Sequence, residues 1–506
     1  MDENERSEPR GHRSLWSLAL LLSLSLLTGC MVGPNFRRPE TPVPAEWAGP
    51  VPKASPEAAS AAEKELTSWW TVFEDQTLTS LIERAVQSNL DLKLAEARIQ
   101  QARASRGISA SFLGPTVDAA GSYSRNQLPG SSLDEDSKGP LTSQYQAGFD
   151  ASWELDIFGG IRRSIESADA NIQVAVENRR DVLVTLTAEV ARNYIDLRAF
   201  QQRIAIAQKN LQAQEHSAKL TRQRFEFGFV SGLDVANAEA QVATTAAVIP
   251  LLEAQARQSI YNLSDLLGLD PAALVEELSP AFSIPVAPPS VPVGVPSDLL
   301  RRRPDIRSAE AGIHSATAQI GVATADLFPK FFLFGSGGYQ AVKFSSWFEP
   351  AGLFWSIGPS VSWPVFDMGR IRSNIEVQKI LTEQSVIVYR QTVLVALQET
   401  ENALIASAKE QEHREALVDA VAANRKAVDL ALKLYTEGLT DFLNVLQAQR
   451  ALFVTEDALV QSNGTVSTNL VALYKALGGG WGMEEEGEDK TLRDREASGP
   501  TPVAQR

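Results

Sequence analysis

Residues 160–227 read GIRRSIESADANIQVAVENRRDVLVTLTAEVARNYIDLRAFQQRIAIAQKNLQAQEHSAKLTRQRFEF, and the rest of the chain can be understood from this stretch. No proline interrupts it, and hydrophobic residues recur at every seventh position: Val176, Leu183, Val190, Leu197, Ile204, Leu211, Ala218 and Phe225. Such a repeat keeps one side of a helix against a partner helix and favours a left-handed supercoil. At about 1.5 Å per residue the helix would be roughly 100 Å long. Because a globular core cannot cover that length, we expect other long helices beside it.

A second copy of this stretch runs from Gly369 to Glu437, 210 positions downstream. The two copies align without a gap from Ser152 to Gly268. The matched positions include Trp153 with Trp363, Gly228 with Gly438, and Leu233 with Leu443. We interpret this as a tandem duplication. Each copy predicts a strand pair, a long helix, a tight reversal at glycine and a returning helix.

The composition argues against several classes of function. The chain has 506 residues, a net charge of −15, one cysteine and four histidines. An acidic balance disfavours nucleic acid as a partner, because nucleic acid needs clustered Lys and Arg. One cysteine allows no disulfide framework and no thiolate metal site, and we expect neither a metal nor another cofactor. The sequence has no nucleophile elbow, phosphate loop or His–carboxylate cluster, so we expect no catalytic residue and no enzyme activity.

The single cysteine follows a segment that is typical of secretion. Arg10 and Arg13 precede the apolar run Leu15–Leu27, and small residues follow it, as in a secretory signal peptide. Leu27-Thr28-Gly29-Cys30 resembles a bacterial lipobox, which implies cleavage before Cys30 and lipid on its sulfur and its new amino group. Met31 stands where an Asp tends to retain lipoproteins at the inner membrane, so the resemblance points to the outer membrane. The alternative is a plain signal peptide with an incidental cysteine.

We expect six parts along the chain. They are a signal peptide (1–29), a lipidated Pro-rich tether (30–64), a first repeat (65–278), a Pro-rich linker (279–297), a second repeat (298–480) and an acidic disordered tail (481–506). In the first repeat a strand pair at 115–158 precedes a long helix hairpin at 160–268. In the second repeat the strand pair lies at 329–366 and the long helix hairpin at 369–478.

Period-two alternation predicts the strands. In the clearest case, apolar residues at odd positions from Tyr145 to Ile157 alternate with polar residues and glycine at even positions, and a similar pattern runs from Leu353 to Val365. Aromatic residues stand eight positions apart on the apolar faces: Tyr145, Trp153, Trp355 and Trp363. That separation spans roughly 20 Å of a tilted strand, close to the apolar band of an outer-membrane barrel with its aromatic girdles. The alternative is a soluble β-sandwich attached to coiled coils.

A mature chain of this kind can cross a membrane as a closed barrel. No stretch after the signal peptide has the 18 or more apolar residues of a membrane helix, and open strand edges are not tolerated in lipid. Four strands cannot close a pore, but three chains with four strands each give twelve. We therefore expect an α+β membrane protein that forms a homotrimer. In it a long α-helical barrel adjoins a transmembrane β-barrel built from three chains.

Three stretches carry a resemblance to a known family: CMVGPNFRRP at 30–39, LRRRPDI at 300–306 and YTEGLTDFLNVLQAQR at 435–450. Together with the Pro-rich tether, the duplicated strand pairs and the Gly-centred reversals, they resemble the TolC-like outer-membrane efflux proteins. The closest branch is the lipoprotein branch that includes OprM and NodT. The resemblance runs from Cys30 to about Gly479.

The resemblance implies a passive, trimeric exit duct for small molecules such as drugs and toxic compounds. Its barrel would lie in the outer membrane, anchored there by lipid, and its helices would extend into the periplasm. The helix reversals would dock on a periplasmic adaptor protein, which joins an inner-membrane pump, most often of the resistance-nodulation-division class. At rest the tips would lie closed like an iris.

Candidate site residues follow from the resemblance. The adaptor-docking tips would be Phe225, Gly228, Ser231, Gly232 and Leu233 in one hairpin and Tyr435, Gly438, Leu439, Thr440 and Leu443 in the other. Each glycine is either a site of close adaptor approach or a turn residue. Leu443, Gln447 and Asp441 would form the pore constriction. Relatives often carry an Asp where this chain has Gln447, which puts a cation-selective ring there in doubt. Asp441 or Asp234 would supply acidic charge at the mouth instead, or act as a helix cap.

Two other functions are compatible with the pattern. One is a lipid-anchored coiled-coil scaffold without a pore, which single-channel conductance distinguishes from a duct. The other is the same fold serving a type I protein secretion system, and the lipobox and Pro-rich start favour small-molecule efflux over it by resemblance.

Overall fold

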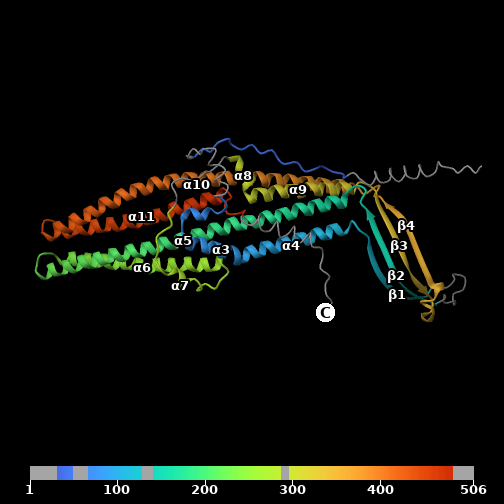
Figure 1. Ribbon diagram of the computed structural model, residues 1–506, viewed down its shortest axis with the longest axis horizontal. Coiled ribbons are helices and arrows are strands. Elements are labelled where there is room, and N and C mark those ends of the chain that lie inside the picture. The colour runs from blue at the N-terminus through green and yellow to red at the C-terminus, as the bar shows by residue number, and fades with distance from the viewer. Residues whose placement is uncertain (1–30, 50–65, 128–140, 287–295, 483–506) are drawn as a thin grey trace, which may run out of the picture. The chain divides into compact units, whose positions relative to one another are not determined.

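The structure of the protein, a computed structural model, describes residues 31–49, 66–127, 141–286 and 296–482 (Figure 1). The predicted signal peptide, the predicted lipidation site Cys30, residues 50–64 of the tether, residues 287–295 of the linker and residues 483–506 of the tail lie outside the described residues. The chain divides into two compact units. The first holds Met1–Glu40, Arg98–Ala175 and Ala309–Tyr389, and the second holds Thr41–Ala97, Val176–Ser308 and Arg390–Arg506.

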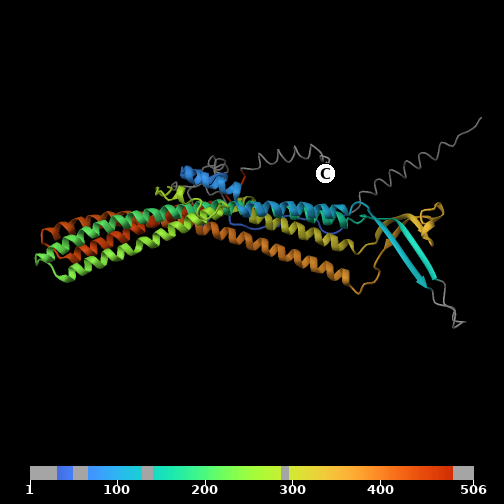
Figure 2. The same ribbon diagram turned by 90° about the horizontal axis from the view of Figure 1, so that it is seen from below.

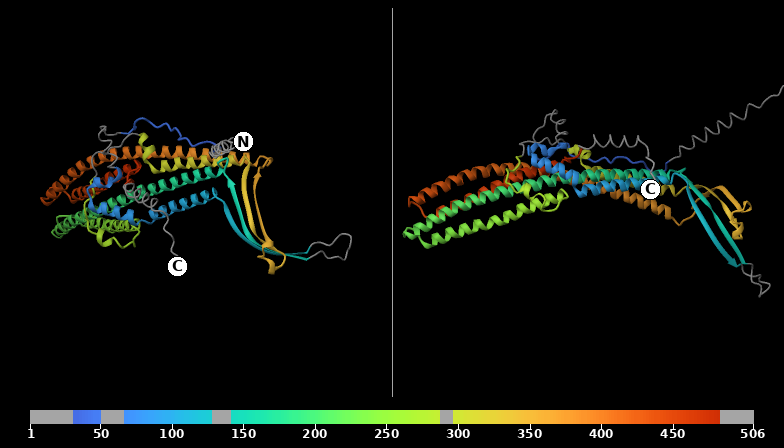
Figure 3. Two further views of the ribbon diagram at one scale, coloured as in Figure 1. Left: turned by 45° about the vertical axis from the view of Figure 1, so that its right-hand side comes forward. Right: turned by 60° about the horizontal axis from the view of Figure 1, so that its bottom comes forward.

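The first unit is built on a four-stranded antiparallel sheet. Its strands lie across the sheet in chain order: β1 (Thr116–Gln127), β2 (Leu141–Leu155), β3 (Lys330–Ala341) and β4 (Leu353–Ser362) (Figures 1 and 3). Helices α4 (Leu90–Ser111) and α9 (Pro304–Ala325) precede β1 and β3. The long helices α5 (Gly160–Glu226) and α10 (Arg370–Thr436) follow β2 and β4. Two short 3-10 helices, η2 (Phe344–Ser346) and η3 (Pro350–Gly352), connect β3 to β4.

The strand register gives the sheet two chemically different faces. Phe149 pairs with Ala119 and with Gly337, and Gly337 pairs with Trp355, so odd-numbered residues of all four strands share one face. That face is apolar throughout residues 117–123, 145–155, 331–341 and 353–361. The opposite face carries mostly polar residues, although three phenylalanines also lie on it. An alternation readable in single strands therefore becomes a continuous apolar surface only through the register.

The second unit contains two helical hairpins. One consists of the end of α5 with α6 (Gly232–Leu266), and the other of the end of α10 with α11 (Phe442–Ala476) (Figures 1 and 2). Polar contacts join them: Arg203 Nε and Nη2 donate to Asp457 at 2.7 and 3.1 Å, and Asn210 Nδ2 donates to Glu456 at 3.0 Å. The predicted long helix and its return are thus present in both halves of the chain.

The seam along α5 differs from its prediction toward the tip. Leu183, Val190 and Leu197 are buried as expected. Closer to the tip the buried positions are Ala207, Asn210, Gln214, Ser217 and Thr221, whereas Phe225 is 48% exposed. The prediction that the hydrophobic seam continues to Phe225 is therefore wrong within the chain. The reason is that Asn210, Ser217 and Thr221 meet the neighbouring hairpin through hydrogen bonds to Glu456, Gln449 and Tyr435, which a search for apolar periodicity cannot detect.

Equivalent contacts recur in the two repeats. The Trp153 indole nitrogen donates to Leu113 O at 2.8 Å, and that of Trp363 donates to Leu327 O at 3.0 Å. At the ends of the returning helices, Asn89 Nδ2 donates to Leu266 O at 2.9 Å and Arg303 Nη1 donates to Ala476 O at 3.1 Å. Leu113 and Leu327 differ by 214 positions, and the other equivalent residues differ by 210 or 214. The tandem repeat is therefore confirmed at the level of single hydrogen bonds.

A cluster of short elements packs beside the hairpins in the second unit. It contains η1 (Trp69–Phe73), α3 (Gln76–Ser88), α7 (Val275–Leu278) and α8 (Pro296–Arg302). Trp69 is fully buried and stacks on Tyr474 with 5.3 Å between ring centroids. Trp481 falls in the predicted tail (481–506), but the guanidinium groups of Arg180 and Arg307 lie over its ring, at 4.7 and 5.2 Å from the centroid. The predicted start of the tail at residue 481 is therefore wrong, because two cations hold this ring.

One helix differs from the expectation about membrane-spanning segments. Among the described residues, α6 is long and apolar enough to cross a membrane by length and composition, with 22% of its most apolar window buried. Its apolarity comes from alanine and valine interspersed with polar side chains such as Gln241 and Thr245, which are buried and hydrogen-bonded to each other. A buried polar pair of this kind is typical of a helix packed against other helices.

Candidate functional site

Each hairpin reverses at a glycine with a left-handed backbone. Gly228 has φ +77° and Gly438 has φ +75°. In both loops the same hydrogen bond closes the helix end, from Gly228 N to Phe225 O at 2.9 Å and from Gly438 N to Tyr435 O at 3.0 Å. The positive φ accounts for both glycines as turn residues. A Cβ at Gly228 would meet nothing within 4 Å, so this loop also leaves open space beside its backbone.

The two returning helices begin in different ways. Ser231 and Asp234 form a reciprocal capping box at the start of α6, with Ser231 N donating to Asp234 Oδ2 at 3.0 Å. Asp234 therefore acts as a cap. Asp441 is the N-cap of α11, the position equivalent to Ser231, but its exposed side chain makes no capping hydrogen bond. Of the two aspartates, Asp441 is the one whose carboxylate is left for other interactions at the tip.

The predicted tip and constriction residues divide by exposure. Leu443 and Gln447 stand four positions apart on α11, share one helix face, and are both exposed. The exposed members are Phe225, Gly228, Ser231, Gly232, Leu233, Gly438, Leu439, Asp441, Leu443 and Gln447, and Thr440 is half-buried. Leu233 and Leu439 keep 69% and 70% of their surface accessible.

Tyr435 differs from this group because its side chain is 2% exposed. Its ring packs with Ala238, Phe442, Val445 and Leu446. Its hydroxyl donates to Thr221 Oγ1 at 3.2 Å. The Tyr435 side chain is therefore covered by its own chain and supports the tip from inside.

Sequence reasoning missed Arg224, which joins the two tips. Its guanidinium lies 4.7 Å from the centroid of the Tyr435 ring. Its Nη1 donates to the carbonyl oxygens of Tyr435 and Thr436, the last carbonyls of α10. A cation there satisfies carbonyls that have no partner within the helix and interacts favourably with the helix dipole. The one sequence feature that could have singled out Arg224 is a difference between the repeats: repeat 2 has Leu434 at the equivalent position.

The predicted belt aromatics lie on the apolar face of the sheet, toward its two ends. Tyr145 stands in a cluster of rings with Tyr123, Phe344 and Trp347, at centroid distances of 4.7 to 5.7 Å. At the other end of the sheet, Trp153 and Trp363 donate to carbonyls of the helix–strand connections. Trp355 is 76% exposed and Trp363 is 54% exposed. Large exposed aromatics at both ends of an apolar surface are typical of strands that face lipid.

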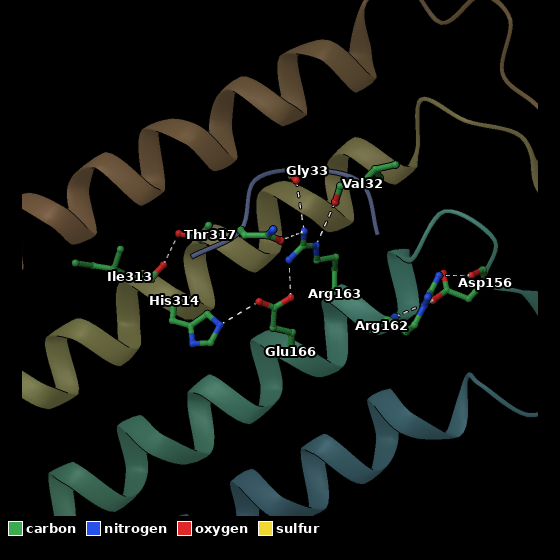
Figure 4. Close-up of polar contacts among 10 residues, drawn as sticks. Val32, Gly33, Asp156, Arg162, Arg163, Glu166, Ile313, His314 and Thr317 are labelled. Atoms are coloured by element: carbon green, nitrogen blue, oxygen red, sulfur yellow. Dashed lines mark hydrogen bonds and ion pairs between the residues drawn. The ribbon is translucent and has the colours of Figure 1, made fainter. Parts of the chain in front are cut away.

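Although Cys30 lies outside the described residues, the segment that follows it is held by Arg163, which is 2% exposed (Figure 4). Arg163 Nε donates to Val32 O at 3.1 Å, and its Nη2 donates to Asn35 Oδ1 at 2.7 Å. Arg163 Nη1 pairs with Glu166 at 2.7 Å, and Glu166 also contacts His314 at 3.0 Å. Burial alone would raise the pKa of Glu166, but the hydrogen bonds from Arg163 and His314 outweigh burial and lower that pKa below its ordinary value.

Within the ranges that the structure describes, no three His, Cys, Asp or Glu side chains gather in a group that could hold a metal ion. The candidate functional features are instead the apolar face of the sheet, the exposed leucines at the helix tips and the N-terminal segment bound by Arg163. Together the strand pairs with their apolar, aromatic-lined face and the long helical hairpins are typical of a channel-type protein of the outer membrane.

The chain belongs to the family described as outer membrane efflux protein, whose sequence profile matches residues 81–269 and 295–479. It is 33% identical over 462 residues to nodulation protein T of Rhizobium leguminosarum bv. trifolii, covering 90% of this chain and 96% of that protein. It is also 33% identical over 489 residues to the toluene efflux pump outer membrane protein TtgC of Pseudomonas putida, covering 96% and 99%. The solved outer-membrane channel OprN has a TM-score of 0.81 and 38% identity, covering 89% of this chain and all of that one.

Proposed function

We propose that the protein is the outer-membrane component of a tripartite efflux pump, a passive trimeric exit duct for small molecules. The observation that carries this proposal is the sheet, which has one face that is apolar through residues 117–123, 145–155, 331–341 and 353–361 and ends in two edge strands, β1 and β4. Unpaired edges cannot lie in lipid, so each edge needs a neighbouring strand. A second and a third copy of the chain supply these strands and close a barrel of twelve.

The surface of α10 supports the trimer. Exposed apolar side chains recur on it at seven-residue intervals: Ile380, Ile387 and Leu394 in one row, and Leu381, Val388 and Val395 in the next. The buried residues Tyr389, Val393 and Ala396 lie on the other side of the same helix, against the rest of the chain. A helix that is apolar on two sides fits between two packing partners. We assign the outer side to a neighbouring copy.

Chemically, the duct supplies a path and the partners supply the energy. The exposed leucines and glycine loops at the tips provide the surface for a periplasmic adaptor, which would link the duct to an inner-membrane pump of the resistance-nodulation-division class. Leu443 and Gln447 line the constriction, and Asp441 places acidic charge at its mouth. Lipid on Cys30 would add an anchor in the outer membrane.

Small molecules are the proposed cargo. The Pseudomonas putida relative is by name a toluene efflux pump component, and a relative in Pseudomonas aeruginosa is by name a pyoverdine export protein. Both cargoes are small compared with an unfolded polypeptide, which favours efflux over protein secretion for this chain.

Single-channel conductance of the purified protein in a lipid bilayer tests the proposal. We expect a low parental conductance that rises several-fold in Leu443→Asp, because three carboxylates at the constriction repel one another. Leu443→Asn is the matched control, since it is polar and of similar size but uncharged. A preparation that passes no ions in any of the three forms would rule out a duct, and equal conductance in all three would remove Leu443 from the gate.

A further inference from the structure

The first described residues of the chain occupy a groove between α5 and α9. We name residues 31–38 the N-terminal strap. Val32 N donates to Phe158 O at 3.1 Å, where β2 gives way to α5. Farther along the strap, the Phe36 ring stacks on His314 with 4.6 Å between centroids, and Arg38 pairs with Glu310 at 2.8 Å. The strap is thus bound at successive points and is not the free tether that its proline content suggests.

The groove fits the strap closely at two glycines. Gly33 has φ +89°, and a Cβ built on it would lie 2.5 Å from the Cα of Gly321 on α9. A Cβ on Gly321 would in turn lie within 2.7 to 2.9 Å of the Arg163 side chain. The strap backbone, the α9 backbone and the Arg163 side chain therefore pack with no room for one more carbon atom.

The internal repeat provides a comparison within the same molecule. The positions equivalent to Gly321 and Arg163 in the other repeat are Gly107 and Ser373. A Cβ at Gly107 would meet nothing within 4 Å. Ser373 cannot supply the three hydrogen bonds to the strap that come from Arg163 Nε and Nη2. The arginine that binds the strap therefore has no equivalent in the second repeat, and these hydrogen bonds are specific to α5.

We propose that this groove is a receptor for the chain's own processed N-terminal segment, with Arg163 as the positioning residue. Binding would fix the lipid attachment point at the end of β2, beside the apolar face that ends near Trp153 and Leu155. The acyl chains would then enter the membrane against the rim of the barrel instead of at the end of a free linker. The assignment of lipid to this point rests on the proposed function, whereas the docking of the strap does not.

Trypsin cleavage in outer membranes tests the docking, because the strap contains one cleavable bond, after Arg37. The bond after Arg38 precedes Pro39 and resists trypsin. Cleavage at Arg37 requires local release of the strap, so its rate reports the population of the undocked form. The rate is followed by mass spectrometry of the chain that has lost residues 30–37, and in parallel by loss of metabolically incorporated palmitate.

The variants approach the contact from both sides. Gly33→Ala changes only the strap, and Asn35→Ala removes one acceptor of Arg163. Arg163→Met removes the donors from the body of the protein. Arg106→Met is the control, because Arg106 makes an exposed ion pair with Asp169 in the same unit. We expect release at least tenfold faster than in the parent for Gly33→Ala and Arg163→Met, and unchanged for Arg106→Met. Cleavage of the double variant Gly33→Ala/Arg163→Met should be no faster than cleavage of the faster single variant, because both substitutions break the same contact.

Parental protection of the strap in Gly33→Ala and Asn35→Ala would overturn the receptor proposal, whatever happens to the folding of Arg163→Met. Equal acceleration by Arg106→Met would also overturn it, because the effect would then be a general loosening. If the parent incorporates no palmitate, the lipid anchor of the proposed function is wrong, while the mass readout still decides whether the strap docks.

Discussion

At the scale of single residues, sequence and structure differ most at the helix tips. The glycines and Ser231 occupy the turn positions that their residue types suggest, because turn and capping preferences are local properties. Tyr435 and Arg224 are different, since their roles depend on a contact between positions 211 apart in the chain. Nothing near Arg224 in the sequence shows that it meets the end of α10.

Replacing Arg224 by Leu, the residue at the equivalent position of repeat 2, should loosen the tips. It removes a cation from the Tyr435 ring and from two helix-end carbonyls, and hydrogen bonds to a charged group contribute on the order of 1.5–3 kcal/mol. We expect a several-fold rise in single-channel conductance and in drug leakage. Arg222→Leu is the control, because its exposed pair with Glu239 is worth at most about 1 kcal/mol. Equal conductance of the two variants would show that Arg224 does not hold the tips.

At the scale of elements, periodicity predicted the strand pairs and both long helices, because the spacing of apolar residues, every second or every seventh position, can be read from the sequence alone. It failed along the part of α5 near the tip, where buried polar residues such as Asn210 and Thr221 form hydrogen bonds with Glu456 and Tyr435. It also gave no information on register. The register decides that all odd-numbered strand residues share one face.

The two faces of the sheet predict opposite responses to a charge in one strand. Ile357→Lys places an ammonium group on the apolar face, at a cost of about 2–4 kcal/mol near the middle of a bilayer. Ser356→Lys places the same group on the polar face one position away. We expect the first variant to be depleted from the outer-membrane fraction and the second to accumulate like the parent. Similar amounts of both variants in that fraction would contradict the assignment of the faces.

At the scale of the whole molecule, the two rows on α10 expose apolar side chains, and β1 and β4 are the edge strands of the described sheet. We propose that neighbouring copies of the chain cover the α10 rows and pair with the edge strands. Sequence periodicity and the single-chain fold support this proposal independently. A charge in the α10 rows should therefore weaken assembly without disturbing the fold of the chain.

Val388 offers such a test, because its side chain is 55% exposed in the single chain. Val388→Glu would bury a carboxylate in each of three interfaces, and an unpaired buried charge strongly disfavours packing. We expect this variant to lose the trimer in detergent, as measured by light scattering, and Val388→Leu to keep it. A stable Val388→Glu trimer would place the interface elsewhere on the chain.

By itself, the sequence determined the kinds of elements, their order and their duplication, because propensities and periodicities act over one or two turns of chain. It also carried the motifs that resemble the efflux family. Only the tertiary structure decided which residues meet: Arg163 with the strap, Arg224 with the end of α10, and Trp481 with its two arginines. These contacts join positions more than a hundred residues apart, and their partners are chosen by packing in three dimensions, which no local pattern encodes.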